Sequence, residues 1–224
     1  MDPGKRGARH PIVTLSTPDS PLCDHLDQAR QIALFDAIME VLSRAPFFRP
    51  TMPRWGTPFS VQMSNCGPLG WVSDKSGYRY QPHHPVTGAP WPAMPEALLE
   101  LWARHARYGA PPEACLINYY APNAKMGLHQ DRDEEDFDAP VLSISLGDGA
   151  RFRLGGMART DPAQTLTLAS GDVMILAGPT RLAFHGIDKV YPGTSSLLSR
   201  RRDLFPEGGR LNLTLRRVNR ILAP

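Results

Sequence analysis

Two residues, His129 and Asp131, combine side-chain types and a spacing that suit metal binding. They stand at the end of an expected strand, residues 126–130, and side chains two apart on a strand point to one face. A third ligand is available in His185, at the end of the run 181–185. Two histidines and one carboxylate form the facial triad of non-haem iron(II) oxygenases, which leaves coordination positions for a cosubstrate and oxygen. The alternative interpretation is a surface turn, because the acidic run 131–138 is typical of one.

The segment 210–217 alternates polar and apolar residues, which is typical of a strand with one apolar face. Its polar face carries Arg210, Asn212, Thr214 and Arg216. This face is either solvated or points into a barrel mouth and grips a dicarboxylate, since a guanidinium meets a carboxylate with two charge-assisted hydrogen bonds. Asn118 and Tyr120 share one face of another expected strand and offer further donors. The metal triad favours the ligand-binding interpretation of both strands.

A group of aromatic residues gives a third feature. Trp71, Tyr78 and Tyr80 stand near the basic residues Lys75 and Arg79. Aromatic rings beside cations can stack on a nucleobase and contact its phosphates. The alternative is packing within a hairpin, which is the more frequent role of a single tryptophan.

The composition indicates one globular unit. A chain of 224 residues with 42% hydrophobic and 21% charged residues can bury a sizeable core. Its 19 glycines and 23 prolines favour turns and short strands over a helical bundle. The net charge of +3 permits contact with a polyanion without requiring it.

Cysteine usage and hydropathy indicate the compartment. The three cysteines show no motif spacing, which argues against a disulfide framework or zinc site and favours a reducing compartment. The basic, polar start has no apolar run after it, and no stretch approaches the roughly 20 apolar residues of a membrane span. We therefore expect a cytoplasmic monomer with no membrane segment.

The elements that must position these residues follow from local patterns. Residues 1–22 read as a flexible arm, with a short strand at 12–15. A helix is expected from residue 24 to the stretch before Pro46, and a second at 95–108 with Gly109 as its stop.

Strands dominate the rest of the pattern. We expect a strand at 59–63 and hairpins with ordered loops in 67–95. Eight short apolar runs between turn signals then predict a sandwich, jelly roll or barrel: 115–120, 126–130, 141–146, 151–154, 165–169, 173–176, 182–185 and 210–217.

Six ordered blocks resemble the AlkB family of oxidative nucleic-acid demethylases, across roughly residues 46–217. They are MSNCGPLGW, GYRYQP, PWPAMP, ACLINYYAPNAKMGLHQDRDE, RLAFHG and RLNLTLRR. The resemblance implies a mainly β fold with flanking helices (α+β), a double-stranded β-helix or jelly roll with an N-terminal nucleotide-recognition lid. The arm would span 1–22, the lid and its support 23–112, and the oxygenase core 113–220.

The resemblance also implies three sets of site residues. Iron(II) would be held by His129, Asp131 and His185. The cosubstrate 2-oxoglutarate would be held by Asn118, Tyr120, Arg210, Asn212 and Arg216. Substrate contacts would come from Trp71, Tyr78, Arg79, Tyr80, Asp133 and Arg159. Within that last set, Trp71 and His129 would sandwich the base, and Asp133 would suit a cationic methylated base.

By the same resemblance, the expected substrate is alkylated DNA, single- or double-stranded, with RNA as a further candidate. The enzyme would hydroxylate the alkyl group of bases such as 1-methyladenine and 3-methylcytosine with O₂ and release formaldehyde, a direct-reversal repair. The cosubstrate would become succinate and carbon dioxide. Because the alkyl group lies on the pairing face, the base must leave the duplex or already be single-stranded.

The chain departs from the family member compared at two places. Leu176 stands where that member has Trp, which predicts a roomier wall of the base pocket. The loop before Arg210 is longer and contains Arg200, Arg201 and Arg202, which are either solvated or contact phosphates.

Two other functions compete with demethylation. A 2-oxoglutarate oxygenase of a protein or small molecule would keep the triad but need no base-stacking aromatics. A nucleic-acid-binding module without chemistry would not require the triad.

Overall fold

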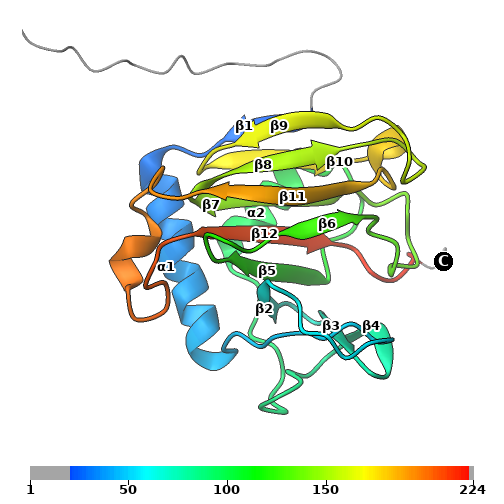
Figure 1. Ribbon diagram of the computed structural model, residues 1–224. Helices are drawn as coiled ribbons and strands as arrows, with labels where there is room; N and C mark the ends of the chain where they lie inside the picture. The colour runs from blue at the N-terminus through cyan, green and yellow to red at the C-terminus, as the bar shows by residue number, and fades with distance from the viewer. Residues whose placement is uncertain (1–20, 222–224) are drawn as a thin grey trace, which may run out of the picture.

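Two antiparallel β-sheets form the body of the protein (Figure 1). The computed structural model describes residues 21–221, so the strand expected at 12–15 and nearly all of the expected arm lie outside the described residues. Within that range the chain is mainly β with two α-helices, as expected. The sheets lie face to face, with helix α2, Glu96–His105, behind the larger one and helix α1, Gln28–Arg44, along its left-hand side (Figure 1).

The larger sheet carries the core. Its strands, in the order β1-β10-β7-β12-β5-β2, are Leu22–His25, Asp172–Leu176, Val141–Gly147, Arg210–Arg216, Ala114–Tyr120 and Gln62–Cys66. The central strand β12 pairs with β5 on one side and β7 on the other, and all seven of its residues are buried. Burial on both faces means that its polar side chains face the interior between the two sheets and not solvent.

The smaller sheet closes the other side of that interior. Its strands, in the order β6-β11-β8-β9, are Met126–His129, His185–Tyr191, Gly149–Leu154 and Gln164–Leu168. A separate hairpin, β3 Gly70–Asp74 and β4 Gly77–Gln81, lies beside the β2 edge (Figure 1). Short 3-10 turns at Gly178–Thr180 and Leu198–Arg201 complete the described elements.

The helices cover the outer face of the larger sheet. Helix α1, Gln28–Arg44, begins where the Asp27 side chain accepts a hydrogen bond from the Arg30 N–H at 2.8 Å. It starts later than expected because residues 22–25 pair with β10 as a strand. Its apolar residues join a buried cluster with α2, Glu96–His105, and the sheet.

Three local expectations are corrected. Helix α2 ends at His105, and Arg107, not Gly109, adopts the left-handed conformation with φ of 48°. The strand expected at 59–63 is shifted to β2. The run 182–185 is a turn, so that His185 begins β11 instead of ending a strand. The other seven expected strands after residue 113 are present with small shifts at their ends.

The hairpin expected in 67–95 is present. Strands β1 and β2 belong to the same sheet as the later strands, and both helices pack on that sheet. No helix within the described range is long and apolar enough to cross a membrane.

Candidate active site

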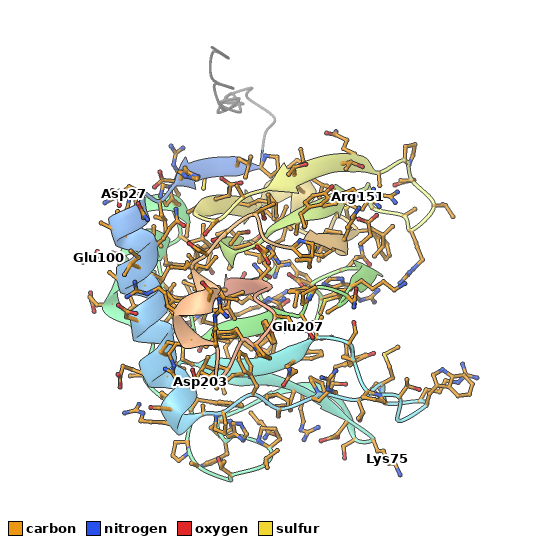
Figure 2. All side chains as sticks on the ribbon, turned by 60° about the vertical axis from the view of Figure 1, so that its left-hand side comes forward. Asp27, Lys75, Glu100, Arg151, Asp203 and Glu207 are labelled. Atoms are coloured by element: carbon orange, nitrogen blue, oxygen red, sulfur yellow. The ribbon has the colours of Figure 1, made fainter. Side chains whose placement is uncertain are left out.

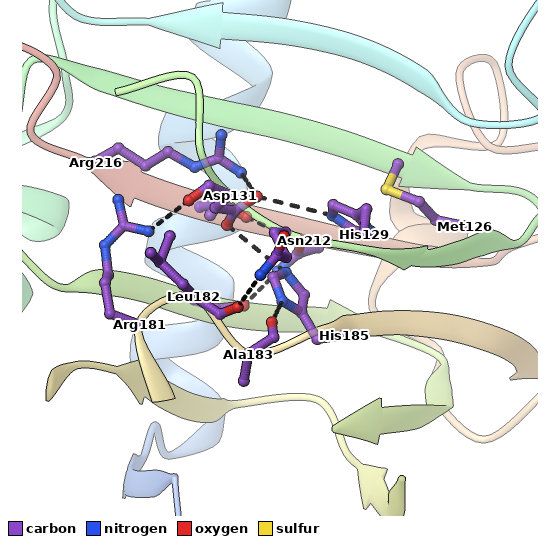
Figure 3. A network of polar contacts seen from close by, with 12 residues as sticks. Met126, His129, Asp131, Arg181, Leu182, Ala183, His185, Asn212 and Arg216 are labelled. Carbon is purple, nitrogen blue, oxygen red and sulfur yellow. Dashed lines mark hydrogen bonds and ion pairs between the residues drawn. The ribbon is translucent and has the colours of Figure 1, made fainter. Parts of the chain in front are cut away.

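Strands β6 and β11 bring the two predicted histidines together. His129 and His185 are direct partners in the ladder, with ring centroids 4.5 Å apart. Asp131 follows β6, and its two oxygens lie 3.8 Å from His129 Nε2 and 3.7 Å from His185 Nε2. The three potential ligand atoms all lie within 4.8 Å of one another (Figure 3). These separations are too long for good hydrogen bonds and suit one ion held between the three atoms.

Backbone carbonyls orient both imidazoles. The Nδ1 of His129 lies 3.0 Å from the Gly127 carbonyl, and the Nδ1 of His185 lies 2.9 Å from the Ala183 carbonyl. A carbonyl can only accept, so each Nδ1 carries the proton and each Nε2 presents its lone pair to the shared space.

The charge state of the triad also suits a metal. Burial lowers the pKa of His185 to about 4, so this ring is neutral near pH 7. Burial alone would raise the pKa of Asp131, but the Arg216 guanidinium beside it holds that pKa well below its usual range. The site therefore offers a neutral imidazole from His185 and an ionised carboxylate from Asp131.

A buried ionic network holds Asp131 in place. Arg216 donates to the Asp131 carboxylate at 2.7 Å and to Glu134 at 3.1 Å. Arg181 donates to the Asp131 backbone carbonyl at 2.7 Å and to Glu134 at 3.2 Å. The Tyr80 hydroxyl donates to Glu134 as well. Sequence reasoning missed Glu134 and Arg181, although both stand inside the blocks that resemble the family.

The triad opens onto a cavity of about 730 Å³ between the two sheets. Twelve of the fourteen predicted site residues line it: Trp71, Asn118, Tyr78, Tyr120, His129, Asp131, Asp133, Arg159, His185, Arg210, Asn212 and Arg216. Leu176 also lines the cavity, as expected for a wall residue of the base pocket.

The cavity wall contains buried polar atoms without partners. Arg210 is 1% exposed, and its Nε and Nη1 make no hydrogen bond, while Nη2 donates to Ser145 at 2.9 Å. Asn118 Oδ1 and Arg216 Nε are likewise unpaired. Unpaired buried polar groups cost free energy, and the unpaired guanidinium nitrogens can donate, so they fit a bound anionic ligand. Burial raises the pKa of Tyr120 to about 12, which keeps its hydroxyl a donor.

Aromatic residues form the mouth of the cavity. The rings of Trp71 and Tyr78 stack with centroids 5.6 Å apart and planes 18° apart. The indole N–H of Trp71 donates to Asp133 at 2.8 Å, which fixes both side chains on the same rim. Arg159 lies over the Phe184 ring at 5.3 Å.

Arg79 and Tyr80 are the two predicted residues that do not line the cavity. Arg79 forms two hydrogen bonds with the Asp74 carboxylate, at 2.8 and 3.0 Å. Tyr80 belongs to the buried network behind Asp131. Lys75, in the turn of the hairpin, points into solvent (Figure 2).

Comparison with known proteins identifies the family. Residues 22–216 match the family model of the 2OG-Fe(II) oxygenase superfamily. The chain is 54% identical over 193 residues to an alpha-ketoglutarate-dependent dioxygenase AlkB homolog of Caulobacter vibrioides, covering 86% of this chain and 84% of the relative. The chain belongs to the AlkB family. The AlkB protein of Escherichia coli is 48% identical over 160 residues, covering 70% of this chain and 74% of that protein.

A solved structure supports the AlkB fold. The structure of OsALKBH1 superposes with a TM-score of 0.69 at 32% identity and covers 88% of this chain and 95% of that one. The double-stranded β-helix expected from the sequence is therefore confirmed. As a member of the AlkB family, the protein uses iron(II), with 2-oxoglutarate and O₂ as cosubstrates.

Proposed function

We propose that this AlkB-family protein is a DNA oxidative demethylase that acts on N-alkylated bases such as 1-methyladenine and 3-methylcytosine, with RNA as a further substrate. One observation carries the proposal. The triad opens onto a cavity whose mouth combines an aromatic wall, Trp71, with a carboxylate, Asp133, joined by a 2.8 Å hydrogen bond. A flat, cationic, alkylated base matches both features.

His129, Asp131 and His185 hold the iron(II) ion through the two free Nε2 atoms and the carboxylate. The fit rests on the convergence of these atoms and on the unpaired, buried Oδ2 of Asp131. When bound, iron and 2-oxoglutarate let O₂ hydroxylate the alkyl carbon, with release of succinate, carbon dioxide and finally formaldehyde from the hemiaminal.

Arg210 would bind a carboxylate of 2-oxoglutarate. It has two unpaired guanidinium nitrogens, whereas Arg216 already holds Asp131 and Glu134. Asn118 and Tyr120 line the path between Arg210 and the triad and supply further polar contacts. Asn212 stands on the same strand as Arg210 and contributes to the 2-oxoglutarate site. Its side-chain amide donates to the Ser143 hydroxyl at 2.7 Å.

The substrate base enters between Trp71 and His129, and Asp133 faces its edge. Tyr78 and Arg159 on the rim contact the strand that carries the base. Arg79 and Tyr80 do not line the cavity, so their proposed role is to hold the hairpin that presents Trp71 and Tyr78.

Formaldehyde release from an oligonucleotide with one 1-methyladenine, in the presence of iron(II), 2-oxoglutarate and ascorbate, tests the proposal. The parent protein should release one formaldehyde per repaired base, and His129→Ala should release none. An oxygenase of a protein or small molecule would consume 2-oxoglutarate with its own substrate but convert no alkylated base in DNA or RNA. That result in iron-loaded protein would refute the substrate assignment.

A reducing compartment such as the cytoplasm suits this enzyme, because a ferrous ion is required and the buried Cys66 and Cys115 are free thiols. We also propose that it acts as a monomer, since the groups named above all come from one chain.

A further inference from the structure

Trp55 is the most exposed large aromatic side chain of the described residues, with 70% of its surface accessible. Among their exposed large hydrophobic side chains, only Val86 is more accessible, at 75%. A tryptophan ring left in water forgoes the large hydrophobic stabilisation that burial gives, so a fully presented ring is typical of a binding surface.

The turn that carries Trp55 is held by its own backbone. The Met52 N–H donates to the Thr57 carbonyl at 2.8 Å, and the Gly56 N–H donates to the Met52 carbonyl at 2.7 Å. Gly56 has a φ of +65°, a conformation that glycine adopts without strain. The ring is therefore presented on a pre-organised turn, which reduces the entropy lost when a ligand binds.

The turn is attached to the mouth of the active-site cavity. Met52 lines that cavity and lies 4.0 Å from the Tyr78 hydroxyl. Thr51 is tied to Ser73 of β3 by two hydrogen bonds, of 3.1 and 2.6 Å. Trp55 is three residues beyond Met52, so its Cα lies at most about 11 Å from that of a cavity-lining residue.

The charge around the ring favours an anionic partner with flat faces. The Arg54 guanidinium lies 4.7 Å from the centroid of the Trp55 ring, and 70% of the Trp55 surface is still accessible. The cavity rim adds the cations Lys125, Arg132 and Arg159. An open aromatic face beside cations is how proteins stack the bases of a single strand without reading their sequence.

We propose that Trp55 is a stacking platform for a nucleobase next to the alkylated one on the same strand. The inference rests on the proposed function, since it places the neighbouring nucleotide of a strand whose alkylated base occupies the cavity. It extends the substrate from a single alkylated base to a strand with a base beside the lesion.

The experiment compares two five-nucleotide strands, each with a central 1-methyladenine. One carries thymine at the four flanking positions, and the other carries abasic sugars there, so that the phosphates are the same. Dissociation constants are measured for the iron- and 2-oxoglutarate-loaded protein without oxygen. The parent should prefer the base-bearing strand by about tenfold, and Trp55→Ala should lose that preference.

Two variants serve as controls. Trp55→Phe keeps an aromatic face and should retain most of the preference. Val86→Ala removes a comparably exposed apolar side chain outside the cavity lining and should leave the preference unchanged. Thermal melting of each variant verifies that the fold is intact.

An undiminished preference in folded Trp55→Ala overturns the inference, while the proposed function stands if the parent still repairs the strand. Trp55→Ala could keep the preference and also turn a dimeric parent protein into a monomer. That result would make Trp55 a contact between two copies of the chain, and it would overturn the inference as well. Absence of repair by the parent protein would instead refute the proposed function.

Discussion

At the scale of single residues, the active site depends on balanced buried charges. The Asp131 and Glu134 side chains are 3% and 0% exposed. The Arg216 guanidinium pairs with both carboxylates, and the Arg181 guanidinium pairs with Glu134. Two carboxylates against two guanidiniums leave no net charge within this network. Removal of one partner leaves an uncompensated buried charge, which is the costly outcome for an internal ion pair.

Glu134→Gln should therefore destabilise the protein by about 3–5 kcal/mol. It should also weaken iron binding, because Arg216 would lose one of its two carboxylate partners and would draw Asp131 away from the two imidazoles. Urea unfolding and iron titration of the metal-free protein measure the two effects. Glu135→Gln, at the exposed neighbouring position, is the control and should change neither.

A second residue-scale prediction concerns pH. Burial lowers the pKa of His185 to about 4, from 6.5 for an unperturbed histidine. Between these values the unfolded chain binds a proton that the folded protein does not, so stability falls as the pH falls. The expected loss in metal-free protein between pH 7 and pH 5 is about 2 kcal/mol from this group.

Urea unfolding of the metal-free protein at pH 7 and pH 5 measures this loss, and His185→Gln should show a smaller one. Equal losses in the parent and the variant would mean that His185 does not carry the effect.

At the scale of elements, the pairing of β6 with β11 sets the distance between the two imidazoles. Gly186 follows His185 directly, and a Cβ at this position would lie 2.6 Å from the Met126 carbonyl oxygen. The strands approach this closely only because position 186 has no side chain. A larger residue must push β6 away from β11 and carry His129 with it.

Gly186→Ala should thus weaken iron binding at least tenfold and lower the melting temperature. Gly127→Ala is the matched control, because a Cβ there meets nothing within 4 Å although it stands on the facing strand. Iron affinity by titration and melting by circular dichroism are the measurements. Unchanged iron affinity in Gly186→Ala would show that iron binding does not depend on the close approach of β6 and β11.

At the scale of the whole molecule, the cavity and the loop that packs on α1 lie in different parts of the protein. The loop after β11, residues 192–209, packs against α1. None of the residues that line the cavity lies in this loop. Phe205 is fully buried and contacts Phe35 of α1 at 6.1 Å between ring centroids. Arg201 pairs with Asp203, which lies beside α1 (Figure 2).

The triple change of Arg200, Arg201 and Arg202 to Ala should therefore leave the salt dependence of single-strand binding unchanged. Lys125→Ala, at the cavity mouth, should reduce the slope of log K against log salt by about 0.7 if it contacts one phosphate. Binding measured at several salt concentrations separates the two outcomes. A reduced slope of log K against log salt in the triple variant would show that the arginines of this loop contact phosphates.

The pattern of short runs and turn residues predicted a sandwich, jelly roll or barrel, because such runs are local properties, and the family resemblance then implied the jelly roll. The sequence also predicted the metal triad, since His129 and Asp131 are two apart and His185 stands in a block that resembles the family. Helix α2 was expected to stop at Gly109, whereas it ends at His105 and Arg107 takes the left-handed conformation, because local signals define a helix end only to within a few residues.

The roles of the two arginines were not readable from the chain. Arg210 and Arg216 share a face of β12, yet only the folded structure pairs Arg216 with Asp131 and leaves Arg210 with open donors. Tyr80 was likewise expected to contact the substrate, whereas its hydroxyl donates to Glu134 in the folded protein. Periodicity determines which face a side chain occupies, but its partner comes from a strand distant in sequence, so only tertiary structure decides which charges meet.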